Sequence, residues 1–387
     1  MDKKMIYAKL IEMLDQNSSL LDKYKQFFNQ YKTIYFLGAG KDGILTVKLL
    51  EDILKDKELY FIDKDKSKHN QEIYNGIYCY GIEKMFGCDF RNTVIIITTF
   101  KYVDELYYEF GSAGPFKAKD KLDCTYVCDK FIRVFNTDFM EFRKCYLNYR
   151  ADILSAFDML DDAESCNILF RVLKGRIKQE ECLADVFSPN QYFPELIKNR
   201  LNEDEVFLDC GSYVGDTIEI FKIETADHFK KVYAFELDKE NFSRLRSNKK
   251  VNDERIVLIN AGVGKENTQI KYAQLGTTSS TCKFLDNNPN VCYAEIKSVD
   301  ELIKQGQIKE KVTFVKMDVE GAELDALKGM EEMLKRDMPK LAISVYHKLE
   351  DLWEIPLFLK SVIPQYEFSL RHHRDGMAET VLYAVVE

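Results

Sequence analysis

The sequence predicts an α/β protein built from two Rossmann-like, three-layer domains that are joined by a helical segment. Two apolar runs each lead into a glycine-containing turn and then into a helical pattern. The C-terminal half alternates apolar strands with amphipathic helices, which is typical of a parallel sheet. Its last two apolar runs are joined by a link too short for a crossover helix, so we expect that sheet to end in an antiparallel hairpin.

Composition limits the classes of protein that the chain can belong to. At 387 residues and 46% hydrophobic content, the chain is long enough for two or three domains with real cores. A net charge of −9, without a basic block, argues against a nucleic-acid partner. The charged N-terminus and the lack of a long apolar run predict no membrane span and a cytoplasmic location. Ten scattered cysteines fit reduced thiols, and the oligomeric state stays open.

Residues 1–135 make up the first predicted domain. Two amphipathic helices open it, and strands follow at Thr33–Leu37, Leu59–Ile62 and Val94–Thr99, with a helix between the first two strands. The third strand begins with a continuous apolar run rather than an alternating pattern, which is typical of a strand buried on both faces. This order of strand, turn, helix and strand predicts a Rossmann-like domain.

The turn after the first strand has the pattern G-x-G-x-x-G, formed by Gly38, Gly40 and Gly43. Asp63 follows 20 positions later at the end of the second strand, where an acid binds a ribose hydroxyl in dinucleotide-binding domains. The stretch 63–81 loosely resembles the nucleotide-sugar-binding domain of bacterial sugar acyltransferases. Two readings stay open: the domain binds a nucleotide or nucleotide sugar, or the glycines only let the helix pack closely on the sheet.

Residues 136–200 have a helical pattern and are expected to form a linker and lid. A loop at 188–194 with two prolines ends this pattern, because proline is incompatible with a helix interior. Within the loop, Tyr192 and Phe193 are candidates to line a substrate entrance. Ordinary packing against the next domain is the interpretation that the sequence favours for both.

Residues 201–387 make up the second predicted domain, and its order of strands is typical of class I methyltransferases. Five parallel strands are followed by a closing antiparallel pair. The predicted strands are Val206–Cys210, Val232–Leu237, Ile256–Asn260, Thr313–Asp318, Leu341–Tyr346, Glu367–Leu370 and Val381–Val386.

Several motifs lie at the ends of these strands. They are Asp209-x-Gly211-x-x-x-Gly215-Asp216-Thr217, Phe235-Glu236, Asn260-Ala261-Gly262, Lys316-Met317-Asp318-Val319-Glu320-Gly321-Ala322-Glu323 and Ser344-Val345-Tyr346-His347-Lys348. Together they resemble the motifs of the FkbM family of S-adenosylmethionine-dependent methyltransferases, which are mostly O-methyltransferases of sugars, glycans and natural products. The resemblance covers about 191–387. It implies in-line transfer of a methyl group to a hydroxyl of a sugar, glycan or related metabolite, so the expected partner is a small-molecule or glycan acceptor.

The predicted cofactor site lies around the first strand of this second domain. Glycines in the turn let the backbone approach a ligand, and Glu236, at the end of the next strand, is placed to accept ribose hydroxyls. The resemblance puts the adenine beside the end of the third strand. The alternative for Glu236 is a surface acid at the start of a helix that Asp238 caps. The predicted cofactor residues are Asp209, Gly211, Ser212, Tyr213, Gly215, Asp216, Thr217, Glu236, Asn260 and Ala261.

Lys316, Asp318, Glu320 and His347 are the predicted catalytic residues. The first three alternate along a strand, so we expect them to face one side, with Asp318 at the methionine moiety and a neighbour at the acceptor. An internal ion pair between Lys316 and one of the two acids is the alternative. His347 is a candidate base because an ordinary histidine titrates near neutrality. Asp318 and Glu320 are too few ligands to define a metal site, so the sequence predicts metal-free transfer.

Two other functions remain open at this stage. One is a nucleotide-sugar or NAD-dependent enzyme centred on the first domain, and the other is a cofactor-binding module without turnover.

Overall fold

The computed structural model describes residues 2–15, 28–85, 92–98, 149–178, 183–274, 280–281, 291–374, 376 and 378–386. The chain divides into two compact units, which are described separately. One unit contains Met1–Met13, Tyr149–Gly175 and Glu180–Glu387, and the other contains Leu14–Asn148 and Arg176–Gln179. The first helix and the helices of the middle segment therefore belong to the unit of the C-terminal sheet, whereas the sequence pattern assigned them to other segments.

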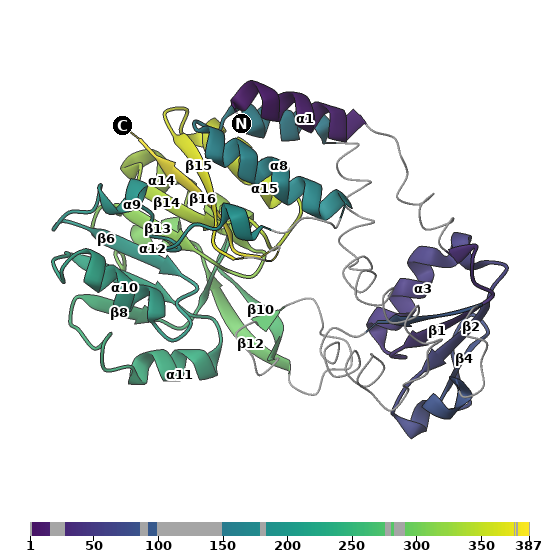
Figure 1. The fold of residues 1–387 in the computed structure, drawn as a ribbon. Helices are drawn as coiled ribbons and strands as arrows, with labels where there is room; N and C mark the ends of the chain where they lie inside the picture. Colours follow the sequence, from purple (N-terminus) through teal and green to yellow (C-terminus); the bar gives the residue numbers. More distant parts are fainter. Residues whose placement is uncertain are drawn as a thin grey trace. The chain divides into compact units, whose positions relative to one another are not determined.

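A seven-stranded sheet forms the centre of the larger unit, with the order β15-β16-β14-β13-β6-β7-β8 (Figure 1). Five neighbouring strands are parallel, and β16 runs antiparallel to both β14 and β15. This arrangement confirms the predicted parallel sheet with a closing hairpin. The strands are β6 (Val206–Cys210), β7 (Lys231–Phe235), β8 (Ile256–Ile259), β13 (Phe314–Met317), β14 (Lys340–Ser344), β15 (Glu367–His372) and β16 (Thr380–Val385).

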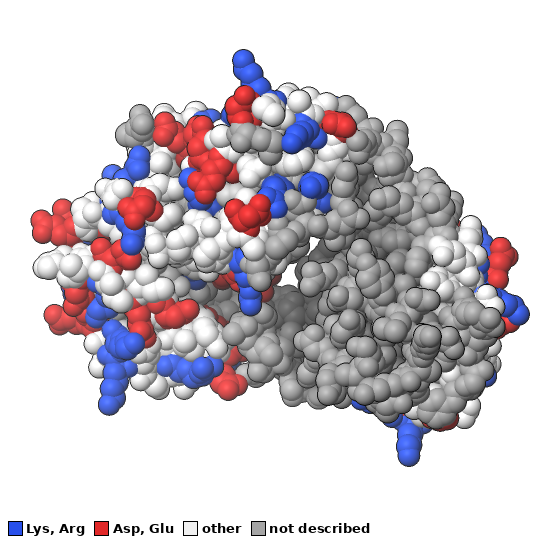
Figure 2. All heavy atoms as spheres, in the orientation of Figure 1, with Lys and Arg blue, Asp and Glu red and all other residues white. Residues whose placement is uncertain are grey.

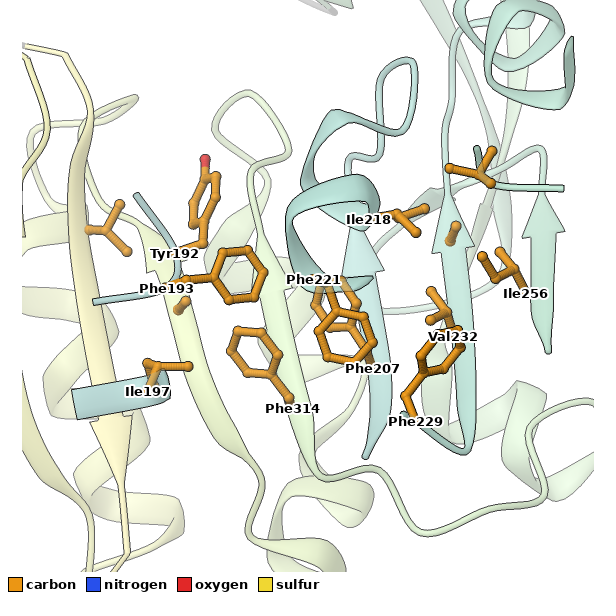
Figure 3. Close-up of a cluster of buried hydrophobic side chains, with 14 of the residues drawn as sticks. Tyr192, Phe193, Ile197, Phe207, Ile218, Phe221, Phe229, Val232, Ile256 and Phe314 are labelled. Carbon is orange, nitrogen blue, oxygen red and sulfur yellow. The ribbon is translucent and has the colours of Figure 1, made fainter. Parts of the chain in front are cut away.

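An aromatic core fills one face of this sheet (Figure 3). Phe207 of β6 and Phe314 of β13 stack with ring centroids 4.9 Å apart, and Phe193 and Phe221 pack on the same pair. All four side chains are fully buried, so this cluster ties the 188–194 loop and α10 to the two central strands. The helices that contribute to this face are α9 (Glu195–Lys198), α10 (Asp216–Glu224) and α11 (Lys239–Ser247).

Further helices of the larger unit pack against one another and extend its core. Helix α1 inserts Ile6 and Leu10, both fully buried, and Lys3 donates to the backbone carbonyls of Asp158 and Leu160 at the end of α7. Helix α15 contacts α7, α13 and α14. These helices are α1 (Lys3–Asp15), α7 (Arg150–Asp158), α8 (Ala163–Lys178), α12 (Val299–Lys304), α13 (Glu323–Lys328), α14 (Glu331–Asp337) and α15 (Asp351–Val362).

A second, four-stranded sheet lies in the chain between β8 and β13, and the sequence analysis did not predict it. Its order is β11-β10-β12-β9, and β10 pairs antiparallel with β12. The strand β10 is rich in polar residues and lacks the apolar run that identified the central strands. Its strands are β9 (Gly262–Val263), β10 (Thr268–Gln274), β11 (Ser280–Thr281) and β12 (Val291–Lys297).

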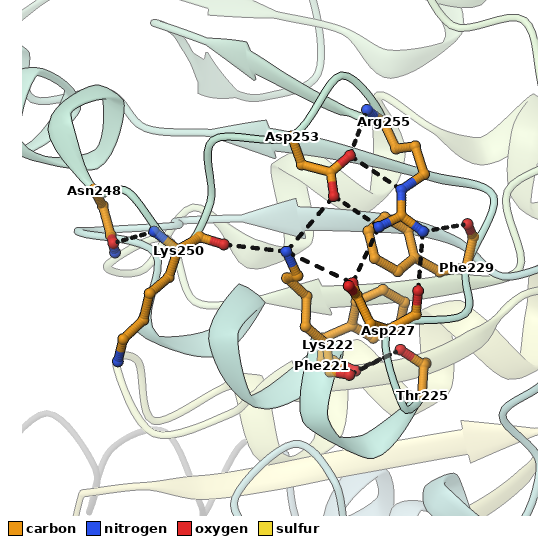
Figure 4. Close-up of polar contacts among 9 residues, drawn as sticks. All are labelled: Phe221, Lys222, Thr225, Asp227, Phe229, Asn248, Lys250, Asp253 and Arg255. Carbon is orange, nitrogen blue, oxygen red and sulfur yellow. Dashed lines mark hydrogen bonds and ion pairs between the residues drawn. The ribbon is translucent and has the colours of Figure 1, made fainter.

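A polar network fastens the loops that enter β7 and β8 (Figure 4). The guanidinium group of Arg255 lies 2.7 Å from Asp253 and 3.0 Å from Asp227, and its centre lies 3.9 Å from the ring centroid of Phe229. Lys222 at the end of α10 lies 3.6 Å from each of the two acids. These residues precede the strands, so the network stabilises the amino edge of the sheet and leaves the carboxyl edge to other residues.

The smaller unit contains a five-stranded sheet with the order β3-β4-β2-β1-β5. Strand β1 is parallel to both β2 and β5, and this central part confirms the predicted strand–helix–strand start of a Rossmann-like domain. The predicted second amphipathic helix lies mostly outside the described residues. The elements are β1 (Thr33–Leu37), α3 (Lys41–Leu54), β2 (Glu58–Ile62), β3 (Glu72–Tyr74), β4 (Ile77–Tyr80) and β5 (Thr93–Ile97).

The visible surface of the larger unit carries charges of both signs. Acidic and basic side chains are interspersed over the part of the chain that Figure 2 colours. Among the described residues, none of the helices has the length and apolar character that crossing a bilayer requires.

Candidate active site

The carboxyl edge of the seven-stranded sheet holds most of the predicted site residues. After β6, the chain turns through Gly211 and Gly215, both at positive φ, into α10. A Cβ atom on Gly211 would lie 1.9 Å from the backbone carbonyl oxygen of Asp318. Because this distance is impossible for real atoms, only glycine lets the turn after β6 approach the end of β13 so closely.

Glu236, directly after β7, reaches back to the turn after β6. Its Oε2 accepts a 2.8 Å hydrogen bond from the backbone N–H of Tyr213, and its Oε1 accepts one of 2.8 Å from the N–H of Asp238. The residue is 8% exposed, and burial raises the pKa of its carboxyl group to about 7 although both N–H groups act in the opposite direction. The alternative of a surface acid is therefore wrong, although Asp238 does cap α11.

The remaining predicted cofactor residues surround this contact. The side-chain amide of Asn260 donates to the backbone carbonyls of Glu236 at 2.8 Å and Leu237 at 3.3 Å, which joins the ends of β7 and β8. The Ser212 hydroxyl donates to the backbone carbonyl of Asp209. Ser212, Thr217 and Ala261 are buried, whereas Asp216 and Asn260 are exposed.

Lys316 and Asp209 form a buried ion pair beneath this edge. The register of β13 and β6 sets the two residues side by side, and Lys316 Nζ lies 3.2 Å from Asp209 Oδ1. Burial alone lowers the pKa of Lys316, but Asp209 and Asp318 outweigh it and raise the pKa. The predicted internal pair between Lys316 and Asp318 or Glu320 is wrong, because a neighbouring strand supplies the partner. Lys316 and Asp209 therefore act as positioning residues.

Asp318 lies one residue beyond the end of β13 and is partly exposed. The Tyr192 hydroxyl donates to its Oδ2 at 2.7 Å, and the Tyr346 hydroxyl lies 3.5 Å from Oδ1. Glu320 has left the strand, since its φ is +55° and it lies in a turn. The predicted polar row along one strand therefore includes Lys316 and Asp318 but stops before Glu320.

His347, three residues after β14, lies between carboxylates. Its Nδ1 is 2.9 Å from Oε1 of Glu323, and its Nε2 is 3.4 Å from Asp318 and 3.5 Å from Glu320. Burial alone lowers the pKa of His347, but Glu323 and the two other acids outweigh it and raise the pKa to about 9. Unless another ligand displaces it, the ring proton stays on His347 at neutral pH, so an unaided role as base is disfavoured.

Glu323 also belongs to the site, although the sequence motifs did not identify it as a site residue. Glu323 begins α13, and its fully buried side chain turns back to accept the backbone N–H groups of Val319 and Gly321 on Oε1. Its place in the E-G-A-E stretch was visible, but a residue at a helix start is usually assigned to the surface.

Tyr192 and Phe193 have different roles, although they are adjacent. Phe193 is core, as the favoured interpretation predicted. Tyr192 has a φ of +67°, which turns its side chain over the site, where its ring lies 5.1 Å from Lys316 Nζ and its hydroxyl meets Asp318. Tyr192 is buried in the same core cluster, as the favoured interpretation predicted, and its hydroxyl in addition contacts Asp318.

The glycine turn of the smaller unit repeats one feature of this site. Asp63 Oδ2 accepts the backbone N–H of Ala39 at 2.9 Å, as Glu236 does for Tyr213, and it also pairs with Lys68 at 2.8 Å. Gly38 has a φ of +111°, and a Cβ on Gly43 would lie 2.1 Å from the Gly38 carbonyl oxygen, while Gly40 has open space.

A cavity of about 380 Å³ in the smaller unit lies away from this turn. Most of its lining residues come before or in the first half of β1, β2 and β5, and Lys84 follows β4, whereas the turn follows the end of β1. Parallel sheets bind ligands at their carboxyl edge, so this cavity does not correspond to the predicted nucleotide site. The lining residues are Lys32, Thr33, Tyr35, Glu58, Tyr60, Lys84, Asn92 and Thr93.

Comparison with known proteins agrees with this geometry. Residues 209–370 match the family described as the methyltransferase FkbM domain. A stretch of 140 residues is 28% identical to the hexuronic acid methyltransferase AglP of Haloferax volcanii, and it covers 36% of this chain and 56% of that relative, about half of its length. The crystal structure of a methyltransferase FkbM from Methylobacillus flagellatus KT has the same fold, with a TM-score of 0.62, 21% identity and coverage of 99% of this chain and 100% of that one.

Proposed function

We propose that residues 209–370, which match the methyltransferase FkbM domain, transfer a methyl group from S-adenosylmethionine to a hydroxyl group of a sugar, glycan or related metabolite by in-line displacement. The observation that carries this proposal is the convergence of the glycine turn, Glu236 and Asp318 at one edge of the sheet. Ligands of open α/β sheets bind at this edge.

The residues present fit the cofactor. Each carboxylate oxygen of Glu236 accepts one backbone N–H and keeps a lone pair for a ribose hydroxyl. Because Gly211 has no side chain, the turn after β6 lies directly against the backbone of Asp318, beside which we expect the amino-acid end of the cofactor. Asn260 fixes the strand ends next to which the adenine is expected.

The cofactor supplies an activated methyl group, so the protein has to align an acceptor and remove one proton. Asp318 is the proposed proton acceptor, because the Tyr192 and Tyr346 hydroxyls orient its partly exposed carboxylate. His347 and Glu320 flank it and are proposed to orient the acceptor hydroxyl. A positioned base typically contributes about 100- to 10,000-fold to the rate, and alignment contributes the larger share.

A sugar hydroxyl is the acceptor class that the comparison favours. The relative from Haloferax volcanii is named for methylating a hexuronic acid. At the site, tyrosine hydroxyls, carboxylates and an imidazole offer hydrogen-bonding partners for a polyhydroxyl ligand.

Titration calorimetry with S-adenosylhomocysteine tests the proposal. The wild-type chain should bind it, and Glu236→Ala should weaken binding by about 100-fold or more, because two hydrogen bonds to a charged group are lost. Glu254→Ala, which removes an exposed acid elsewhere in the unit, is the control and should bind like the wild type. No binding by the wild-type chain would refute the function, and unchanged affinity of Glu236→Ala would refute the ribose role alone.

A further inference from the structure

Three side chains at the acceptor side of the site converge in a way that the transfer of a methyl group does not explain. Asp318 and Glu323 each offer a carboxylate oxygen and His347 offers a ring nitrogen, and these three atoms all lie within 4.8 Å of one another. The three residues come from the end of β13, the start of α13 and the segment after β14, so the tertiary fold brings them together. Glu320 lies 3.5 Å from His347 Nε2 and adds a further acid at the open side.

Glu323 shows that this convergence is not fully satisfied by protein groups. Its side chain is fully buried, its Oε1 accepts two backbone N–H groups, and His347 Nδ1 lies 2.9 Å from the same oxygen. Its Oε2 is also buried and has no hydrogen-bond partner among the residues that the structure describes. A buried carboxylate oxygen without a partner is costly, and a cation is the ligand that would satisfy it.

The charge around His347 favours a cation as well. Asp318, Glu320 and Glu323 place three carboxylates within 3.5 Å of one imidazole ring. An imidazolium ion balances only one of them. Lys316, the buried lysine on the same sheet, is already paired with Asp209. Even with His347 protonated, the three carboxylates outnumber the one imidazolium charge that lies directly against them.

We propose that Asp318, Glu323 and His347 bind a divalent metal ion. Two carboxylates and one imidazole form a mixed oxygen and nitrogen set, which suits Mn²⁺ or a similar first-row ion better than Mg²⁺. Three protein ligands leave coordination positions for the oxygen atoms of an acceptor. This role in acceptor binding depends on the proposed methyl transfer, and in the metal-bound state Asp318 would be a ligand rather than the free proton acceptor. The binding of the metal itself does not depend on the transfer. The proposal replaces the expectation of metal-free transfer, which considered Asp318 and Glu320 alone.

A simple ion pair between Glu323 and His347 is the competing interpretation. It accounts for the 2.9 Å distance between Nδ1 and Oε1. It also accounts for Asp318, because the second N–H of a protonated imidazole faces that carboxylate at 3.4 Å. It leaves Oε2 of Glu323 buried and without a partner among the residues that the structure describes. A bound metal ion would satisfy this oxygen, and the two interpretations differ in whether the protein binds Mn²⁺.

Titration of the metal-free full-length protein with Mn²⁺ tests the proposal, with free Mn²⁺ followed by its electron paramagnetic resonance signal. The wild-type chain should bind one Mn²⁺, more tightly than it binds Mg²⁺ in competition. Asp318→Asn and Glu323→Gln should each weaken this binding by at least tenfold. Both variants keep the shape of the side chain, and circular dichroism confirms that they fold. Glu254→Gln is the control and should bind like the wild type.

The outcomes are distinct from those of the proposed function. No saturable binding of Mn²⁺ by the wild-type chain, or equal binding by all four proteins, would overturn the metal site. Binding of S-adenosylhomocysteine, measured without metal, reports on the other side of the crevice through Glu236. A protein that binds Mn²⁺ but not S-adenosylhomocysteine would keep the metal site and refute the transfer function.

Discussion

Glu236 shows how one side chain can be costly for the fold and useful for binding. The carboxyl group is buried between two backbone N–H donors, and burial raises its pKa to about 7. A fold without a ligand requirement at this position would place a neutral residue there. The cost is understandable if the charged form is needed to accept ribose hydroxyls, in line with the perturbed pKa values that cluster at functional sites.

The raised pKa predicts how Glu236 affects stability against pH. Its folded pKa of about 7 lies above the ordinary value of 4.5, so the folded state holds the proton more tightly. The resulting stabilisation is complete below pH 4.5 and is lost as the pH rises through about 7. Compared with Glu236→Gln, the wild-type free energy of unfolding should fall by about 2 kcal/mol between pH 5 and pH 8.

Urea unfolding of both proteins at the two pH values measures this difference, and the other titrating groups cancel in the comparison. If the free energies of unfolding of the two proteins differ by the same amount at both pH values, Glu236 has an ordinary pKa.

At the scale of elements, strands β6 and β13 are joined by a charged pair as well as by packing. Phe207 of β6 stacks on Phe314 of β13. Two positions further along the same strands, and therefore on the same face, Asp209 pairs with Lys316. The apolar pair lies in the middle of the sheet, and the charged pair lies directly below the glycine turn. The buried ion pair therefore supports the turn rather than the acceptor.

Replacement of Lys316 tests this structural role. Lys316→Met leaves Asp209 buried without its partner and should lower the free energy of unfolding by about 3 kcal/mol. The double variant Asp209→Val with Lys316→Met removes both charges and should recover most of that loss. Lys335→Met, on the exposed side of α14, is the control and should change stability little.

Denaturant unfolding of the four proteins measures these effects. If Lys316 instead faced the acceptor in open water, Lys316→Met would be nearly as stable as the wild type.

At the scale of the whole molecule, the two units contain the same local device. In each, a parallel strand runs into a glycine turn, and an acid at the end of the next strand accepts an N–H group from that turn. In the larger unit this device lies in residues 209–370, which match the methyltransferase FkbM domain. For the smaller unit, the binding of a nucleotide or nucleotide sugar stays a proposal based on the turn and Asp63.

Two separate cores predict two transitions in scanning calorimetry. S-adenosylhomocysteine at 100 times its dissociation constant should stabilise one of them by about 2.7 kcal/mol and leave the other unchanged. A UDP-sugar should move the other transition if the smaller unit binds it. If S-adenosylhomocysteine shifts neither transition, the proposed function is contradicted. If only one transition is seen, the two units do not unfold independently.

The sequence by itself determined the central strands of both sheets, the glycine turns and the acids that follow the second strands, because side-chain periodicity and glycine chemistry are local properties. Tertiary structure alone decided the partners. Tyr192 reaches Asp318 across 126 positions, and Lys316 lies opposite Asp209 because of strand register. Glu323 meets His347 because a helix start and a strand end are packed together. A pattern of hydrophobicity contains no information on such pairs, since it records which face a residue occupies and not which distant residue shares that face.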